Sequence, residues 1–230
     1  MIAPTPAPST AHATSLRAVW PAILGLSIVF LTEMLDNSVL NVALPTITRE
    51  LGATASDLQW ITTAYSLLFG GLMLVFGTIA DRYGRRRIML IGLTLFAVAS
   101  LAVILVRTPG ELTAVRAVIG IAAAMTAPGS MALSFRLFDD DTLRVRATAL
   151  ISTVGLTGLA IGPTVGGLIL AVWPWQALLV INVPIAILAA CCIRFGIRAD
   201  HPAELHRAPL DLIGAARASG DARQRWSVGG

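Results

Sequence analysis

Apolar residues of this chain gather in six long stretches that are separated by short polar segments. The stretches cover residues 19–40, 58–80, 88–106, 112–135, 147–172 and 177–195. A helix needs about 20 apolar residues to cross the hydrocarbon layer of a bilayer, and each stretch is close to that length or longer. The pattern therefore predicts an all-α membrane fold, with six transmembrane helices in one bundle over residues 18–198.

The composition agrees with a membrane protein and not with a soluble domain. Only 13% of the residues are charged, whereas a soluble domain carries about 25%. The first stretch is too long for the apolar region of a secretory signal and contains Glu33 and Asp36, so we expect it to stay in the mature chain. Residues 1–17 are rich in Pro, Ala, Ser and Thr without periodicity, which predicts a disordered cytoplasmic leader.

The distribution of arginine predicts the orientation of the chain in the membrane. All 17 basic residues are arginine. Nearly all of them precede the first stretch, follow the sixth, or lie in the second and fourth connecting segments, whereas the opposite side has only Arg49 and Arg107. Segments rich in arginine stay on the cytoplasmic side. We therefore expect a multi-pass protein of the cell inner membrane with both termini in the cytoplasm, and no binding of nucleic acid.

Residues that usually bind metals or carry out covalent chemistry are scarce and scattered. Cys191 and Cys192 are adjacent, and this spacing builds neither a disulfide framework nor a metal site. His12, His201 and His206 lie in the leader and the tail, without a zinc-like arrangement. The chain contains no phosphate-binding loop and no nucleophile elbow. The sequence therefore predicts no metal, no cofactor and no enzymatic activity, and it disfavours an ATP-driven pump.

The first apolar stretch carries a polar stripe. Glu33, Asn37 and Asn41 follow one another at four-residue steps, and Asp36 comes three residues after Glu33, so one helix face is polar. Ionisable groups inside a bilayer cost at least about 2.5 to 3.5 kcal/mol each and usually line a cavity. We therefore favour a water-lined cavity over a structural polar seam. Glu33 either helps to bind a cationic substrate or lies nearer the outer mouth.

Arg116 lies inside a predicted span, about one turn into the fourth stretch and close to the outer surface. A cation that faces the same cavity favours the ionised form of a nearby carboxylate. We therefore expect either that Arg116 tunes proton release by Asp36, or that its side chain extends along the helix to the membrane surface.

The second connecting segment, GTIADRYGRRR at residues 77–87, concentrates charge between two predicted spans. A glycine near the end of the second span permits a close helix approach, and a glycine in the segment permits a tight turn. An aspartate among arginines can exchange partners between two states of a protein. The candidate residues for such a conformational switch are Gly77, Asp81, Arg82, Gly84, Arg85 and Arg86.

The fifth stretch repeats glycine on one helix face. Gly155, Gly158, Gly162 and Gly166 recur at steps of three and four residues, which brings them to the same side of a helix. Pro163 introduces a local kink. The pattern predicts close packing of another helix against this face.

Several of these segments resemble signatures of the major facilitator superfamily. The 77–87 segment resembles the loop signature of the family, and LDNSVLNVALP at residues 35–45 resembles the first-helix signature of its drug:proton antiporter branch, particularly the fourteen-helix group. GLTGLAIGPTVGG, which ends at Gly167, resembles the fifth-helix antiporter motif, and INVP at residues 181–184 resembles the sixth-helix signature.

The fourth stretch matches the family only in part. Arg116 and Gly120 agree with the fourth-helix motif, whereas Ile119 stands where the family usually has glutamine. Gln176 likewise stands where the family usually has arginine. The resemblance as a whole runs from about residue 31 to residue 212.

The resemblance implies both a fold and a mechanism. It implies the N-terminal half of a transporter, in which six helices form a 3+3 inverted repeat and two such halves rock around a site at the membrane midplane. It implies that Asp36 exchanges protons for substrate, that the 77–87 segment stabilises one of two states, and that the proton gradient supplies the energy without a cofactor. The expected partners are the lipid bilayer, an apolar or cationic small-molecule substrate, and a second transporter half or a second copy of the chain.

The residues after the sixth stretch leave the function of this chain open. The resemblance continues through LDLIG at residues 210–214, and the polar sequence that follows cannot cross a bilayer. We therefore expect residues 199–230 to form a cytoplasmic tail that is truncated or frameshifted after about residue 215, in a chain that is inactive alone. The alternatives are a half-transporter that works as a dimer or with a second half, and a non-transporting regulatory or scaffold subunit. An intramembrane enzyme with Glu33 and Asp36 as a carboxylate pair is weaker, because no further catalytic group converges on them.

Overall fold

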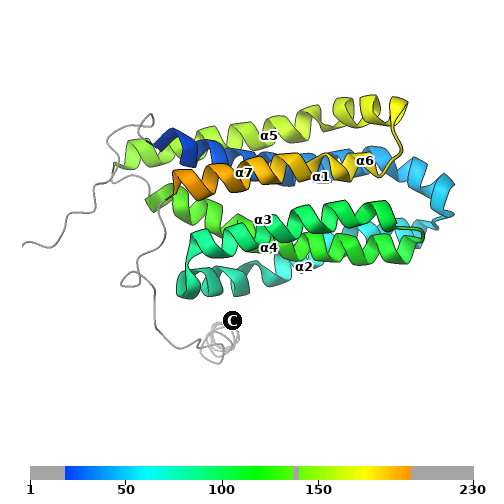
Figure 1. Ribbon diagram of the computed structural model, residues 1–230, viewed down its shortest axis with the longest axis horizontal. Helices are drawn as coiled ribbons and strands as arrows, with labels where there is room; N and C mark the ends of the chain where they lie inside the picture. Colours follow the sequence, from blue (N-terminus) through cyan, green and yellow to red (C-terminus); the bar gives the residue numbers. More distant parts are fainter. Residues whose placement is uncertain (1–18, 137–139, 198–230) are drawn as a thin grey trace, which may run out of the picture.

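The computed structural model describes residues 19–136 and 140–197, which fold into one bundle of long helices (Figure 1). The helices are α1 (Trp20–Leu51), α2 (Ala55–Tyr83), α3 (Arg85–Ala102), the 3-10 helix η2 (Val103–Leu105), α4 (Pro109–Arg136), α5 (Asp141–Val172), α6 (Ala177–Val180) and α7 (Asn182–Gly196). They provide six spans that are long and apolar enough to cross a membrane, with α3 and η2 in one span and α6 and α7 in another. The predicted six-helix, all-α fold is therefore confirmed. The predicted leader and tail lie outside the described residues.

Helix α1 continues to Leu51, well past the end of the first apolar stretch. Its polar residues do not end the helix, because Asn41 Nδ2 and Thr48 Oγ1 donate to the carbonyl oxygens four residues back, at 3.0 and 2.9 Å. The helix ends at Gly52, whose φ of 64° lies in the left-handed region that glycine adopts at little cost.

These longer helices place the candidate residues away from the helix ends. Glu33 and Asp36 both lie near the middle of α1. Helix α4 begins at Pro109, so Arg116 lies about two turns into the helix and not about one. Proline is tolerated in the first turn because its missing N–H would have no partner within the helix.

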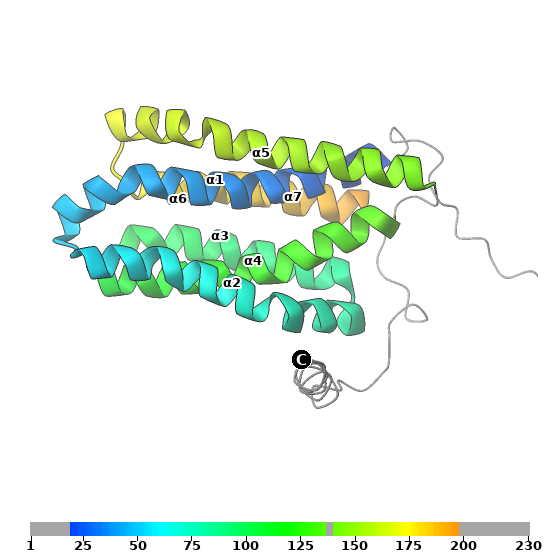
Figure 2. The same cartoon turned by 180° about the vertical axis from the view of Figure 1, so that it is seen from behind.

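The packing of the helices repeats itself between the first three spans and the last three. The first, second and third spans (α1, α2, α3) correspond to the fourth, fifth and sixth (α4, α5, α7). Helix α1 packs on α5, and in the same way α4 packs on α2. Helix α3 packs on α4, and in the same way α7 packs on α1. Helices α3 and α7, the third and the sixth span, pack on each other. Because α4 starts at the end of the bundle opposite to the start of α1, the two sets of three helices run in opposite directions (Figures 1 and 2). The six spans therefore have the arrangement of a 3+3 inverted repeat.

The two ends of the bundle differ in charge. The turn between α2 and α3, the start of α1, the start of α5 and the end of α7 gather at one end, as both views show (Figures 1 and 2). This end, called the basic end below, carries Arg82, Arg85, Arg86, Arg87, Arg144, Arg146 and Arg194. The opposite end carries Arg49 and Arg107.

Side-chain caps fix where two of the helices begin. At the start of α2, the Thr54 hydroxyl and the Asp57 carboxylate each accept a hydrogen bond from the other residue's backbone N–H, at 3.3 and 2.8 Å. At the start of α5, Asp140 Oδ1 accepts hydrogen bonds from the backbone N–H groups of Thr142 and Leu143. These two bonds hold the pKa of Asp140 below its usual range, because they stabilise the ionised carboxylate.

Candidate functional site

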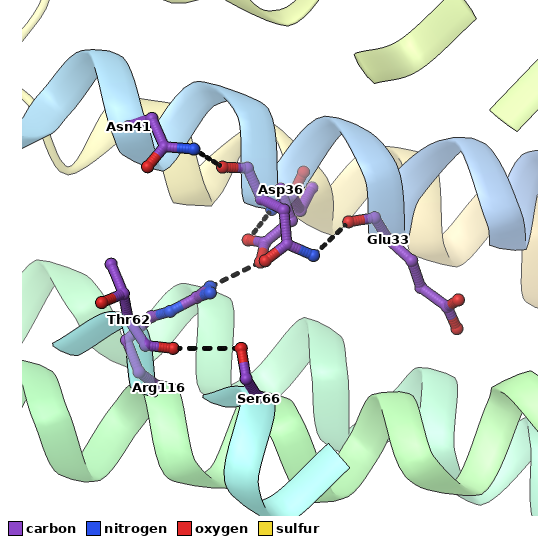
Figure 3. A network of polar contacts seen from close by, with 8 residues as sticks. Glu33, Asp36, Asn41, Thr62, Ser66 and Arg116 are labelled. Carbon is purple, nitrogen blue, oxygen red and sulfur yellow. Dashed lines mark hydrogen bonds and ion pairs between the residues drawn. The ribbon is translucent and has the colours of Figure 1, made fainter. Parts of the chain in front are cut away.

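Asp36 is the centre of a polar site in the interior of the bundle. Its side chain on α1 is fully buried, with 0% of its surface exposed. Arg116 Nη1, from α4, donates to Asp36 Oδ2 at 2.5 Å (Figure 3). Asn182 Nδ2, from the start of α7, donates to Asp36 Oδ1 at 2.8 Å. Each carboxylate oxygen thus has a partner from a different helix, and the carboxylate ties three helices together.

The position of Arg116 depends on a close approach between α2 and α4. A Cβ atom at Gly120 would lie 2.6 Å from the Tyr65 carbonyl oxygen, so only glycine allows the two backbones to come this close. The approach places the guanidinium group of Arg116 4.5 Å from the centre of the Tyr65 ring, where a cation is attracted to the aromatic face. Arg116 is 1% exposed. It is therefore buried between Asp36 and Tyr65, and does not extend to the surface of the bundle.

Glu33 is the second buried carboxylate, and its surroundings differ from those of Asp36. It is 4% exposed and accepts a hydrogen bond from Thr126 Oγ1 of α4 at 2.6 Å. Its carboxyl group points away from Asp36 (Figure 3). Among the described residues no cation forms an ion pair with Glu33, whereas Asp36 is paired with Arg116. The two carboxylates therefore have different partners: a cation for Asp36 and a hydroxyl group for Glu33.

The rest of the polar stripe leads from this interior to the surface of the bundle. Asn37 is half-buried and donates to the Glu33 carbonyl at 2.9 Å, while Asn41 is exposed. On the neighbouring α2, Thr62 is half-buried and Ser66 is exposed (Figure 3). Polar groups from α1 and α2 therefore mark a path between the buried Asp36 and the outside of this bundle.

The turn between α2 and α3 binds the ends of two other helices. Gly84 makes the turn with a φ of 103°, and Asp81 pairs with Arg85 across it at 2.7 Å. Arg85 Nη1 also donates to the Ala132 carbonyl of α4 at 3.3 Å. Arg86 Nη2 donates to the Arg194 carbonyl of α7 at 2.6 Å. Arginine side chains thus bond to carbonyl groups near the C-terminal ends of α4 and α7, where positive charge is favourable.

Two other residues of the predicted switch make no comparable contact between the described helices. A Cβ atom at Gly77 would lie 3.7 Å from Pro128, an ordinary contact distance, so the close approach predicted at Gly77 is not made within this bundle. Arg82 lies over the ring of the exposed Tyr83, at 5.7 Å from its centre.

The predicted glycine face of α5 packs against α1. A Cβ atom at Gly158 would lie 2.9 Å from the Leu31 carbonyl oxygen, and one at Gly166 would lie 3.2 Å from Val42. At Gly155 and Gly162 an added Cβ would overlap side chains of α1, namely Phe30 and Ser38. Gly167 belongs to the same motif but has no atom of another residue near its Cβ position, so it lies off this face.

Pro163 and Ser38 complete the contact between α1 and α5. Proline lacks the N–H that would bond to the carbonyl four residues earlier, which is that of Leu159. Ser38 Oγ, from α1, donates to this carbonyl at 2.8 Å. A hydroxyl from one helix therefore satisfies the carbonyl that proline leaves without a partner in the other.

The contact between α1 and α5 predicts that two glycines of the α5 motif differ in how well they tolerate a larger residue. We expect Gly162→Ala to destabilise the purified protein by roughly 1 to 3 kcal/mol, because the new methyl group overlaps Ser38. Gly167→Ala is the matched control and should change stability by less than about 1 kcal/mol, since nothing lies near its Cβ position. Thermal unfolding in detergent measures both. Equal unfolding temperatures for the two variants would contradict the packing described.

Some residues of the site were not predicted from the sequence. Asn182 lies within the INVP segment but had no predicted role, and Thr126, Tyr65 and Ser38 were not singled out. The only signal in the sequence that could have identified Asn182, Thr126 and Ser38 is that each is a polar residue in an apolar span. No group of three or more His, Cys, Asp or Glu side chains is placed to hold a metal ion within residues 19–136 and 140–197.

Comparison with known proteins gives the same family that the motifs resemble. Residues 26–227 match the family described as Major Facilitator Superfamily. The chain is 39% identical over 170 residues to the puromycin resistance protein pur8 of Streptomyces alboniger, covering 74% of this chain and 34% of that protein. It is 36% identical over 178 residues to the multidrug efflux pump LfrA of Mycolicibacterium smegmatis, covering 77% of this chain and 35% of the relative.

A third relative and a solved structure extend the comparison. The methyl viologen resistance protein SmvA of Salmonella typhimurium is 35% identical over 199 residues, which cover 84% of this chain and 40% of SmvA. A bacterial homologue of the human lysosomal transporter Spinster, in an inward-facing and unoccupied conformation, superposes with a TM-score of 0.66 at 16% identity, over 85% of this chain and 45% of that chain. That likeness shows the fold. The chain spans less than half the length of each of these proteins.

Proposed function

This chain belongs to the major facilitator superfamily, and we propose that it forms one six-helix half of a multidrug exporter that moves drug outward in exchange for protons. Its curated relatives include drug resistance and efflux proteins, which supports a transporter function. The observation that carries the proposal is the buried ion pair between Asp36 and Arg116, because an ionisable pair in a membrane interior is costly and usually functional.

The geometry of Asp36 suggests how proton binding would change the protein. In the ionised state, Asp36 holds α4 through Arg116 and holds α7 through Asn182. A proton on Asp36 removes its charge, so the attraction to Arg116 weakens and α1 is less strongly held to α4. Proton binding would then favour a second arrangement of the helices, and drug would be released as access changes. We place the basic end in the cytoplasm and the chain in the inner membrane, because arginine-rich segments stay inside.

We propose that a second six-helix bundle completes the substrate site. Helices α2 and α5 are the least enclosed spans, with 17% and 22% of their apolar windows buried, compared with 72% for α1. Large apolar residues on α2 and α5 are exposed, among them Leu74 at 82% and Leu168 at 68%. Such faces suit contact with lipid or with another bundle. A separate second half or a second copy of this chain could supply it, since the two halves of this fold are related by an axis along the membrane normal.

Reconstitution in proteoliposomes tests this function. We expect the purified chain alone to give no accumulation of a cationic dye under an imposed proton gradient. Together with a complementary second half we expect accumulation above empty vesicles. Transport by the chain alone, if it is lost in Asp36→Asn, would instead establish a working homodimer. No transport in either setting, with stable binding of another membrane protein, would favour the regulatory or scaffold role.

A substitution in the turn between α2 and α3 tests whether this turn acts as a switch. Asp81→Asn should slow transport by about two- to fivefold at near-normal expression, because a partly exposed ion pair contributes up to about 1 kcal/mol to one state. Asp141→Asn, which breaks the exposed pair with Arg144 at the same end of the bundle, is the control and should leave transport unchanged. If Asp81→Asn transports at the rate of the unmodified protein, the turn contributes only to membrane orientation.

A further inference from the structure

Asn182 is buried beside the proposed proton site, and only one end of its amide group has a partner. Its side chain is 0% exposed, and Nδ2 donates to Asp36 Oδ1 at 2.8 Å. The other end, Oδ1, accepts no hydrogen bond from any described residue. A buried polar atom without a partner costs free energy, so the site is better suited to a second state in which this oxygen accepts a hydrogen bond.

The amide group can serve Asp36 in either protonation state. An ionised carboxylate only accepts hydrogen bonds, whereas a protonated carboxyl group also donates one. Asparagine has a donor and an acceptor of nearly the same size, so a half-turn of its amide exchanges them in place. Nδ2 of Asn182 matches the ionised Asp36, and Oδ1 would match the protonated Asp36. Arg116, the other partner of Asp36, can only donate.

Asn182 also stands at a break in the sixth span. Helix α6 ends at Val180 and α7 begins at Asn182. Pro184 lacks the N–H that would bond to the Val180 carbonyl, which weakens the helix at this joint. The span can therefore change its angle where it contacts Asp36, while α7 remains bound through its first residue.

Few charged or titratable groups can influence this contact. Those around Asp36 are Arg116 from α4, Glu33 from α1 itself and Tyr65 from α2. Helix α7 also contains Cys191 and Cys192, which lie toward its opposite end. The described charged residues of α3, α5 and α7 all lie at the basic end: Arg85, Arg86, Arg87, Asp141, Arg144, Arg146 and Arg194.

We propose that Asn182 is a positioning residue that hydrogen-bonds Asp36 in both protonation states, by turning its amide, and so keeps the sixth span attached to the proton site throughout the cycle. When a proton binds Asp36 Oδ1, the carboxylate loses its negative charge, the amide turns, and the new O–H donates to Asn182 Oδ1. When the proton leaves, Nδ2 donates to the carboxylate again. The proposal rests on Asp36 being the proton site.

Infrared difference spectroscopy of the full chain in lipid nanodiscs tests this inference without any transport. Asparagine is labelled with ¹³C in its side-chain amide, and spectra are taken as the pH is lowered. The protonated Asp36 carboxyl band is identified by its absence in Asp36→Asn. As this band appears, we expect one labelled amide carbonyl band to move to lower wavenumber, because that oxygen becomes a hydrogen-bond acceptor. The amide change should be absent in Asp36→Asn.

Two variants assign the band to Asn182. Asn182→Leu should remove the amide change while the carboxyl band of Asp36 still appears as the pH is lowered. The midpoint pH of that band should rise by up to about one unit, because Asn182 bonds more strongly to the ionised Asp36 than to the protonated Asp36. Gln176→Leu, which removes another amide just before the same span, should leave both the amide change and the midpoint as they are.

The outcomes separate this inference from the proposed function. If Asp36 titrates but no labelled amide band moves in the unmodified protein, the role of Asn182 is refuted and the proton site stands. If the amide change persists in Asn182→Leu, another asparagine is responsible and the proposal is again refuted. If no carboxyl band of Asp36 appears over the accessible pH range, both the proton site and the inference fail.

Discussion

Asp36→Asn is expected to abolish proton-coupled efflux while leaving the protein inserted in the membrane. Asparagine has nearly the shape of aspartate. Its side-chain oxygen can accept from Arg116 and its amide N–H can donate to the oxygen of the Asn182 amide, so the three helices remain in contact. It cannot bind and release a proton. Efflux of a cationic dye should therefore fall to background in cells that contain the chain and its second half. The comparison is made at equal amounts of inserted protein, because the substitution leaves the buried Arg116 without its anion.

The control for this variant lies on the same helix. Glu50→Gln neutralises an exposed carboxylate near the end of α1 and should leave efflux unchanged. Drug-induced proton release, measured in proteoliposomes that contain the chain and its second half, gives an independent reading. Proton release that persists in Asp36→Asn would show that another group carries the proton, and Glu33 would be the first residue to examine.

Arg116→Met is expected to cause the largest loss of stability. It keeps much of the length of the side chain but leaves Asp36 buried without its cation, which typically costs about 3 to 5 kcal/mol. The loss should be smaller at acid pH, because a protonated Asp36 carries no charge that needs compensation. Thermal unfolding of the purified chain at two pH values measures the effect without any transport. Arg107→Met, at an exposed arginine, should change little.

A double variant separates the stability of this ion pair from its function. Asp36→Asn with Arg116→Met removes both charges, so no unpaired charge remains inside the bundle. We expect it to regain much of the stability lost in Arg116→Met, and to have no proton-coupled transport. A double variant as unstable as Arg116→Met would mean that the arginine acts mainly through its contact with Tyr65.

The fold could be predicted from the sequence because each span is encoded locally. Six apolar stretches separated by short polar segments leave little choice but six membrane helices. The glycine face of α5 was likewise visible, because it depends only on spacing along one helix. Its partner was not, since nothing in the glycine spacing identifies Ser38 or α1. The end of α1 was missed because polar side chains that bond to their own helix look like interruptions in a sequence.

The candidate site was predicted only in part: Asp36 and Arg116 were singled out, whereas Asn182 and the arrangement of the three residues were not. Asp36 and Arg116 are 80 positions apart, and Asp36 and Asn182 are 146 apart, so their pairing follows from tertiary packing. The arginines of the turn between α2 and α3 were expected to exchange partners with Asp81. Arg85 and Arg86 also bind backbone carbonyl groups, and every residue has a carbonyl, so no residue type identifies such a partner.

The turn between α2 and α3 makes the basic end of the bundle rigid. One short segment is joined to the ends of α4 and α7 as well as to α2 and α3, so these helices should rotate together and not splay apart. Helix α4 has 28 residues and is about 42 Å long, so a rigid rotation of about 10° about the tied end would carry its far tip through about 7 Å. A small rotation of these helices at the basic end would therefore move their far ends by a distance that is wide enough to open a passage for a small molecule.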